Sequence, residues 1–252
     1  MTSGTSGGRF VEGAVLGIET SGNHTGAALL ADGRLIAEVI VDYRSGAAEQ
    51  LPEVLRRMLA DHDMPPRRLR RVGVSLGPGS FTGLRIGLAT ARGLAWGADL
   101  PLVAVSSHEV LAWPWKESGA PVVLLTGLRR ERLFLEAGSW SGDWWSARIP
   151  ARNVNLLEVA EALRPLAGDA PWRFTGESVA SVLAAVPDLG RWGAPTADPL
   201  HGLRRPAVVA LLAARTGARE TIGQAMEDLE PRYLREADAR RPVPTAGGRR
   251  GG

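Results

Sequence analysis

Apolar runs of strand length and one amphipathic stretch fill the first sixty residues. Residues 14–21 and 25–31 each have the apolar composition of a buried strand. Asp32-Gly33 is a tight-turn pair that leads into a third strand over 34–41. From 47 to 61 the apolar residues recur at the spacing of one helical face. The pattern predicts an antiparallel meander followed by a helix.

The next segments predict strands that are joined by helices. We expect a strand over 71–76, a helix over 82–97 and a strand over 102–106. The resulting order, βββαβαβ, resembles the ribonuclease-H-like lobe of the actin, Hsp70 and sugar-kinase (ASKHA) group. The predicted fold class is therefore α/β with two such lobes.

The second half repeats this order in a shorter form. Strands are predicted over 122–126, 132–137 and 144–149, and helices over 155–163, 179–185 and 207–216. We interpret this half as a degenerate second lobe. The expected division is a disordered tail over 1–12, the first lobe over 13–107, the degenerate lobe over 108–238 and a disordered basic tail over 239–252.

Charge changes this picture little. The sequence pI is about 10.1, but 30 basic and 27 acidic residues give a net charge of only +3. The segment from Arg235 to the end accounts for all of it, with five arginines against Glu236 and Asp238. For this tail a solvated end is favoured over binding to RNA. With no cysteine and no apolar run of membrane length, we expect a soluble, cytoplasmic protein.

A glycine-rich segment over 76–87 is the candidate functional signature. Its glycines match neither the dinucleotide fingerprint nor a P-loop. Gly77, Pro78 and Gly79 predict a rigid turn, and either Ser80 or Thr82 could cap the helix that follows. The loop therefore leads directly into the N-terminus of the predicted helix over 82–97.

That helix carries small residues four positions apart, so one stripe is nearly bare backbone. The stripe would let either a partner helix or the chain's own sheet approach closely, and the spacing favours neither. If a partner binds there, the predicted interface is Gly83, Leu84, Arg85, Ile86, Gly87, Thr90, Ala91 and Leu94.

No residue pattern predicts a catalytic or metal site. No two of the four histidines have the helical spacing of metal ligands, and there is no Gly-x-Ser-x-Gly elbow. Glu19, Thr20 and Ser21 end the first predicted strand, where the actin-like group normally carries an aspartate that organises magnesium, and this resemblance implies that they could mark a vestigial nucleotide cleft. A glutamate there reaches about one methylene further than an aspartate would, which weakens a magnesium site. An ordinary carboxylate at a strand end is the favoured alternative.

The string 77–87, read with residues 15–21 and with Pro-Arg-Tyr-Leu-Arg at 231–235, resembles the bacterial TsaB (YeaZ) family over about residues 13–238. The resemblance implies a non-catalytic subunit that pairs with a TsaD-type transferase through a helical bundle containing the helix over 82–97. With a TsaE-type ATPase, that complex threonylcarbamoylates the adenosine beside the anticodon of tRNA. ATP and magnesium would then be used through partner subunits, tRNA would be contacted indirectly, and a homodimer is the alternative state of the free chain.

This chain departs from the family pattern at three places: Glu19, residues 45–49 and residues 127–129. The first and third bear on any nucleotide cleft, and the second on one edge of the interface. The competing hypothesis is an ATP-dependent transferase or phosphotransferase of the same fold that acts alone, with Glu19, Gly77 and Gly79 around the phosphates.

Overall fold

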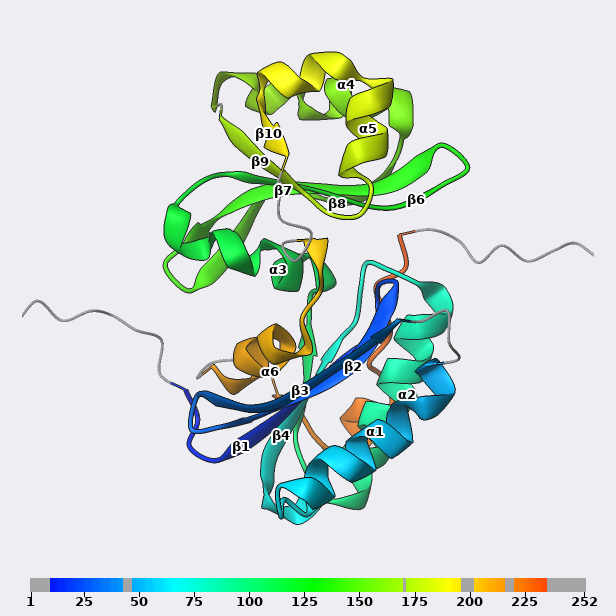
Figure 1. The fold of residues 1–252 in the computed structure, drawn as a ribbon, viewed down its shortest axis with the longest axis vertical. Coiled ribbons are helices and arrows are strands. Elements are labelled where there is room, and N and C mark those ends of the chain that lie inside the picture. The colour runs from blue at the N-terminus through cyan, green and yellow to red at the C-terminus, as the bar shows by residue number, and fades with distance from the viewer. Residues whose placement is uncertain (1–9, 43–46, 170, 196–201, 216–219, 235–252) are drawn as a thin grey trace, which may run out of the picture.

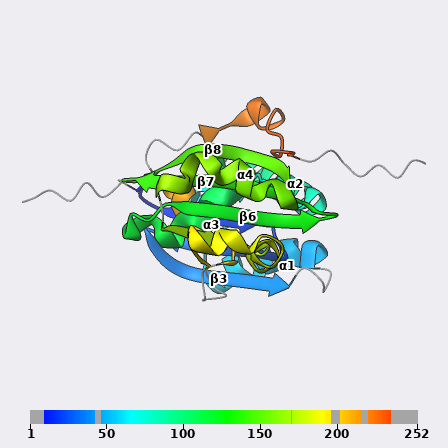
Figure 2. The same cartoon turned by 90° about the horizontal axis from the view of Figure 1, so that it is seen from above.

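Two lobes lie one above the other, each built on one mixed β-sheet (Figures 1 and 2). The computed structural model describes residues 10–42, 47–169, 171–195, 202–215 and 220–234. In these ranges no helix has the length and apolarity needed to cross a membrane.

The sheet of the first lobe has the strand order β11-β5-β4-β1-β2-β3. Strands β1, β2 and β3 are antiparallel, whereas β1, β4 and β5 are parallel. The strand bounds are β1 Ala14–Glu19, β2 His24–Ala31, β3 Arg34–Asp42, β4 Leu69–Ser75, β5 Leu102–Val105 and β11 Glu220–Thr221. The meander with helix-connected parallel strands confirms the ribonuclease-H-like plan.

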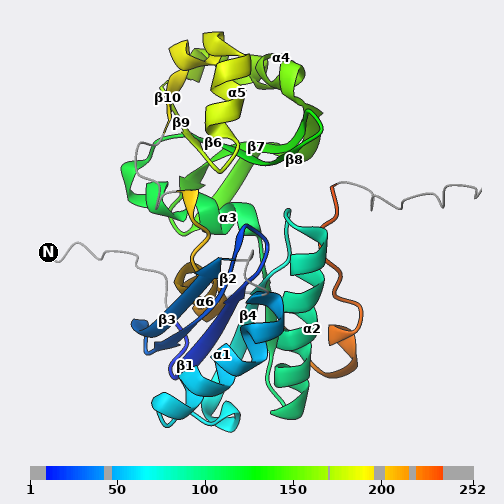
Figure 3. The ribbon, with the colours of Figure 1, turned by 45° about the vertical axis from the view of Figure 1, so that its right-hand side comes forward.

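Helices cover both faces of this sheet (Figure 3). Helices α1 (Ala47–Asp61) and α2 (Phe81–Gly97) lie on one face, where their apolar side chains form a core with Leu16 and Ile18. Helix α6 (Pro206–Ala214) lies on the other face against β1, β2 and β4. Residues on alternate sides of β1 therefore enter two different cores.

The second sheet has the order β10-β9-β6-β7-β8, which repeats the order of the first without its extra edge strand. Its strands are β6 Val122–Arg129, β7 Arg132–Ser141, β8 Trp144–Asn155, β9 Trp172–Thr175 and β10 Gly193–Pro195. Its helices are short: α3 Ser107–Ala112, α4 Val159–Leu163 and α5 Val179–Ala185. The second lobe therefore has the same order of strands as the first, and it is smaller mainly because its helices are short.

Short 3-10 helices connect several of these elements: Pro66–Arg68, Trp113–Ser118, Leu156–Glu158, Arg164–Asp169, Pro187–Arg191 and Gly223–Met226. The helix expected over 155–163 is divided into one such turn and α4. Asn155 caps the turn in a reciprocal capping box with Glu158, which explains the early start of helical backbone.

The predicted boundary between lobes is wrong at its C-terminal end. Helix α6 and strand β11 lie within the range 108–238, yet they pack on and pair with the first sheet. At the other end, Phe10 forms a bridge to Arg215, so residues 10–12 belong to the first lobe rather than to a tail. The predicted tails over 1–9 and 239–252 lie outside the described residues.

One apolar core runs from α6 through α3 to β6 and so joins the two lobes. Val209 of α6, Leu111 of α3 and Leu124 of β6 are each fully buried in it. Because burial of apolar surface drives folding, this shared core makes the two lobes one cooperative body around the cleft between them.

Candidate functional site

The glycine loop lies between β4 and α2 and against the turn after β1. Gly77 has φ of 104°, a backbone conformation that favours glycine. At Gly79, a Cβ atom would lie 2.3 Å from the carbonyl oxygen of Ser21. Pro78 follows a cis peptide bond, and the Ser80 side chain caps α2. The loop and the β1–β2 turn thus approach each other through backbone alone.

The small-residue stripe of α2 faces inward. A Cβ atom on Gly83 would lie 2.0 Å from the carbonyl oxygen of Thr20, and one on Gly87 would lie 2.2 Å from the Thr20 hydroxyl. Ala91 and Leu84 are fully buried. The prediction that these four residues of α2 face a partner is therefore wrong, because the chain's own β1 end occupies the space beside them.

The outer face of α2 carries the rest of the predicted interface. Arg85 is exposed, and Ile86, Thr90 and Leu94 are partly exposed. A groove of about 1140 Å³ runs beside Thr90 and Leu94, between α2 and α1, whereas Arg85 lies on the side of α2 that faces the C-terminal segment. From α1 and the turn after it, the groove is lined by Pro52, Leu55, Leu59 and Met64, and from α2 by Ala89, Thr90, Gly93 and Leu94. This groove was not predicted from the small-residue stripe.

The C-terminal segment lies along α2 and returns to the glycine loop (Figure 3). The Arg232 amide donates a hydrogen bond to the Leu76 carbonyl over 2.6 Å. The Arg85 guanidinium lies 3.9 Å from the centre of the Phe81 ring and donates to the Tyr233 hydroxyl over 3.0 Å. Two sequence motifs more than 140 residues apart therefore form one structure.

Glu19 is buried at the end of β1, with 1% of its surface exposed. One carboxylate oxygen accepts hydrogen bonds from the Ser21 amide at 2.6 Å and from the Ser21 hydroxyl at 2.5 Å. Burial raises the pKa of Glu19, an effect opposed by the charge of Arg204 and by the Ser21 hydrogen bonds. A buried carboxylate with a raised pKa, already bonded to its neighbour and facing a guanidinium, does not fit a magnesium site.

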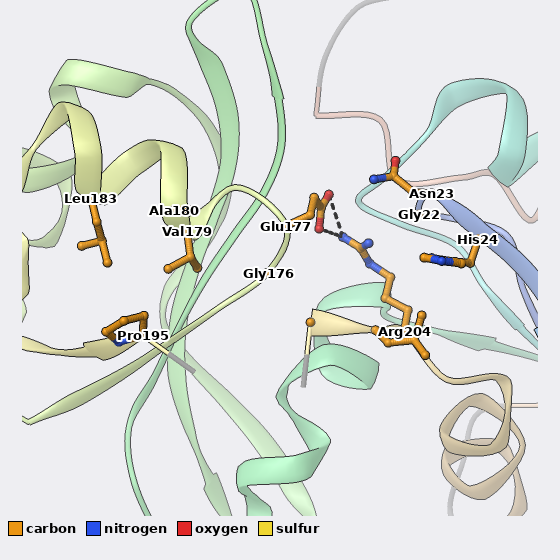
Figure 4. A pocket seen from close by; sticks show the side chains of 12 residues that line it. Gly22, Asn23, His24, Gly176, Glu177, Val179, Ala180, Leu183, Pro195 and Arg204 are labelled. Atoms are coloured by element: carbon orange, nitrogen blue, oxygen red, sulfur yellow. Dashed lines mark hydrogen bonds and ion pairs between the residues drawn. The ribbon is translucent and has the colours of Figure 1, made fainter. Parts of the chain in front are cut away.

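Arg204 connects the two lobes across the cleft (Figure 4). Its guanidinium lies 3.2 Å from the Glu177 carboxylate, and a Cβ atom on Gly22 would lie 2.6 Å from the same guanidinium. Glu177 also accepts a hydrogen bond from the Gly127 amide over 2.8 Å. One arginine thus links the β1–β2 turn of the first lobe to the β9–α5 turn of the second and, through Glu177, to the C-terminal part of β6.

Two cavities flank this arginine. One, of about 570 Å³, has a polar wall at Asn23 and His24 and an apolar wall at Val179 and Leu183, as Figure 4 shows. The other, of about 510 Å³, opens between the glycine loop and the C-terminal part of β6. Residues Thr20 and Ser21, predicted beside Glu19 at a nucleotide cleft, diverge: Ser21 lines the second cavity, whereas Thr20 is buried beneath α2.

A buried polar cluster lies behind the cleft. His108 is fully buried, with Nδ1 2.8 Å from Glu136 and Nε2 3.0 Å from the Thr126 hydroxyl. Burial lowers the pKa of His108, an effect opposed by the hydrogen bond and the charge of Glu136. Trp145 donates to the other oxygen of Glu136 over 2.6 Å.

Sequence reasoning missed this cluster and the Arg204–Glu177 pair. His108 and Glu136 are 28 positions apart, and Arg204 and Glu177 are 27 apart, so no local motif marks either pair. Within the described ranges, no group of three His, Asp or Glu side chains is arranged to hold a metal ion.

Comparison with known proteins identifies the family. A tRNA threonylcarbamoyladenosine biosynthesis protein TsaB of Bacillus subtilis is 31% identical over 226 residues, which cover 89% of this chain and 95% of that protein. The chain belongs to the TsaB family. A solved structure from Pseudomonas aeruginosa, described as similar to peptidase YEAZ, has a TM-score of 0.71 and 22% identity, and covers 88% of this chain and 100% of its own. The TsaB-type fold thus extends over nearly all of the chain.

A second relationship is confined to part of the TsaB-like chain. The family model described as TsaD, tRNA N6-adenosine threonylcarbamoyltransferase, matches residues 44–137. A protein of that name from Nitratidesulfovibrio vulgaris is 34% identical over 139 residues, 49% of this chain and 35% of that protein. The matched range contains α1, β4, the glycine loop and α2.

Proposed function

We propose that this chain is a non-catalytic subunit that binds a TsaD-type transferase and supports threonylcarbamoylation of the adenosine beside the anticodon of tRNA. Its membership of the TsaB family supports the pathway. The match of residues 44–137 to the TsaD model indicates that both proteins contain an equivalent α1–α2 unit. Two such units can pack as a pseudo-symmetric pair, with each groove receiving the other's helix.

The observation that carries this proposal is Gly93. It lies in the interior of α2, is exposed, and borders the α1–α2 groove. A Cβ atom built there would meet nothing within 4 Å in this chain. Glycine inside a helix costs about 1 kcal/mol relative to alanine, and the fold itself gives no reason to keep it. A helix of another chain, approaching closely over Gly93, provides that reason.

The subunits of the complex divide its tasks. ATP and magnesium are used by partner subunits, including a TsaE-type ATPase, because Glu19 is buried and lines neither cavity of this chain's cleft, and Arg204 is paired with Glu177. When the transferase is absent, a second copy of the chain occupies the same groove.

The test is co-purification of the chain with a TsaD-type transferase. Gly93→Leu places a bulky side chain over the groove and should abolish co-elution while leaving the melting temperature of the free chain unchanged or higher. Ala184→Leu, on the exposed side of α5 in the other lobe, is the matched control and should bind normally. Co-elution that survives Gly93→Leu would place the interface elsewhere.

Calorimetry with Mg-ATP separates this proposal from an enzyme that acts alone. A supporting subunit should neither bind nor hydrolyse Mg-ATP at micromolar concentration by itself. Micromolar binding with turnover by the isolated chain would favour the independent transferase.

A further inference from the structure

The cavity of about 570 Å³ beside Arg204 has no part in the proposed interface. It lies between the lobes, and none of the described residues that line it also lines the α1–α2 groove. Its volume is within the range of about 300–1,000 Å³ that is usual for small-molecule sites. Val179, Ala180 and Leu183 of α5 form an apolar wall, and the facing wall is polar (Figure 4). Such a cavity suits a small molecule with one polar and one apolar end.

The polar wall holds one charge of each sign. Arg204 and Glu177 both line the cavity, and their ion pair of 3.2 Å balances the two charges. The Glu177 side chain is 30% exposed, so its carboxylate can be approached from outside the pair. A ligand with a single charge would be repelled by one member of the pair, and a phosphate ester, with a charge of about −2, would be repelled by Glu177. A ligand that carries both signs of charge avoids this repulsion.

Arg204 has hydrogen-bonding capacity that the ion pair does not use. A guanidinium has five N–H donors, and Nη2 is the atom that contacts Glu177. In the described part of the chain, Nε is buried without a hydrogen-bond acceptor. Nη1 lies beside Gly22, which also lines the cavity and where a Cβ atom would come within 2.6 Å of Nη1. Because the φ of Gly22 lies outside the left-handed region, the backbone does not require glycine there, and its effect is to keep space open beside the guanidinium.

Asn23 and His24 add further polar groups to the same wall. Both residues are exposed, and neither side chain has a hydrogen-bond or ion-pair partner within the ranges that the structure describes. An amide and an imidazole can each donate and accept hydrogen bonds. They are therefore available to a hydroxyl or carboxyl group of a ligand.

We infer that this cavity binds a free α-amino acid as a zwitterion. The ligand carboxylate accepts hydrogen bonds from the Arg204 guanidinium, its ammonium group donates to Glu177, and its side chain lies against Val179 and Leu183. Hydrogen bonds between charged groups are about twice as strong as neutral ones, so a ligand this small gains both affinity and orientation from them. Arg204 precedes α6 of the first lobe and Glu177 precedes α5 of the second, so the bound amino acid would contact both lobes.

L-Threonine is the amino acid that matches both walls. Its methyl group suits the apolar wall, and its hydroxyl suits Asn23 or His24. The choice of threonine also rests on the proposed function, because the modification adds a threonylcarbamoyl group. The zwitterion site itself rests only on the cavity and its charges.

The test is calorimetry of the full-length chain with L-threonine and with two blocked analogues. L-Threonine should bind with a Kd below about 1 mM. L-Threonine amide lacks the carboxylate and N-acetyl-L-threonine lacks the ammonium group, so each should bind at least about tenfold more weakly. Equal binding of all three compounds, or no saturable binding of L-threonine and L-valine, would overturn the inference. Binding of L-valine as tight as that of L-threonine would support the amino-acid site and overturn the hydroxyl contact.

Two tryptophan variants place the site in this cavity. Ala180→Trp fills the cavity from its apolar wall without removing either charge, and it should abolish L-threonine binding. Ala185→Trp is the matched control, because Ala185 is exposed, lies five positions later on another side of α5 and does not line the cavity. It should bind L-threonine normally, and normal binding by Ala180→Trp would overturn the site. Glu177→Gln should weaken binding on the order of tenfold, and melting temperatures identify any variant that misfolds.

The outcomes separate this inference from the proposed function. Gly93→Leu should bind L-threonine normally, and Ala180→Trp should still co-elute with the transferase. Failure of the unaltered chain to bind L-threonine or L-valine, with normal co-elution, would overturn the amino-acid site and leave the subunit role standing. Binding of L-threonine by a chain that does not co-elute with the transferase would support the site and overturn the subunit role.

Discussion

Gly87 and Gly93 lie six residues apart on α2 and face different surroundings. Gly87 touches the Thr20 side chain, where a Cβ atom would be 2.2 Å from its hydroxyl oxygen, whereas Gly93 has open space beside it. The first glycine is required by the chain's own packing. The second glycine is not required by that packing, so a role for it depends on a partner that binds to the outer face of α2.

Substitution at the two positions should therefore change stability in opposite directions. Gly87→Ala overpacks the contact with Thr20 and should lower the free energy of unfolding by about 1–3 kcal/mol. Gly93→Ala should raise it by about 1 kcal/mol, the difference in helix propensity. Urea denaturation of both variants measures this, and equal effects at the two positions would show that the inward and outward assignments are wrong.

Glu19 should make the stability of the fold depend on pH. Because burial raises its pKa above the ordinary value of 4.5, the unfolded chain loses this proton first as the pH rises. The folded state therefore loses stability from about pH 4.5 upward through the raised pKa. Glu19→Gln keeps an oxygen to accept from Ser21 but cannot ionise.

Thermal melts of Glu19→Gln and the unaltered chain at pH 4 and pH 7.5 provide the measurement. The melting temperature of Glu19→Gln minus that of the unaltered chain should be larger at pH 7.5 than at pH 4. A difference that is independent of pH would mean that Glu19 is ionised in the fold as easily as in the unfolded chain.

At the scale of elements, α2 contacts three different neighbours. Its inner stripe packs on the end of β1, one side borders α1, and another side is covered by the C-terminal segment. Arg92 holds the C-terminal segment against α2. Its guanidinium donates to the carbonyl of Met226 at 2.7 Å, to that of Glu227 at 3.0 Å, and to that of Leu229. One side chain thus closes the end of the 3-10 helix Gly223–Met226.

Arg92→Met should release this segment from α2. Three backbone carbonyls lose a charged donor, and we expect a loss of about 1–3 kcal/mol in unfolding free energy. Hydrogen exchange should rise over 223–233 more than in β1 or β4. Uniform exchange across the first lobe would instead indicate that the segment has no separate stability.

At the scale of the whole molecule, Arg204 and the shared core hold the lobes together. The core around α3 and α6 is apolar, whereas Arg204 supplies a polar link at the open side of the cleft. Its guanidinium is nearly buried, with 5% of the side chain exposed, and Glu177 is 30% exposed.

Arg204→Met should lower the unfolding free energy by about 1–3 kcal/mol, since Glu177 is left partly buried without its partner. The double variant Arg204→Met/Glu177→Gln should recover part of that loss, because the remaining charge is removed as well. A double-mutant cycle measures the coupling. Additive losses would show that the pair does not link the lobes.

The pattern of apolar positions determined most of the elements and the class of fold. Strands β1 to β6, helices α1 and α2 and the start of β7 lie close to their predicted bounds. Most of these strands are continuous apolar runs that are buried on both faces, and the two helices bury apolar positions at the helical period. The glycine loop was also evident from composition and spacing, and the resemblance of this loop and of the Pro-Arg-Tyr-Leu-Arg segment to a known family indicated the family.

Only the tertiary structure decided which surfaces these elements use. A stripe of small residues indicates that another segment approaches the helix closely. The end of β1 and a partner helix are both compatible with that spacing. In the structure, Thr20 occupies the space beside the stripe. The return of α6 and β11 to the first sheet, and the pairing of Arg204 with Glu177, join positions far apart in sequence. Local periodicity reports which face of an element is buried, whereas the identity of what covers it depends on long-range packing, which no local pattern encodes.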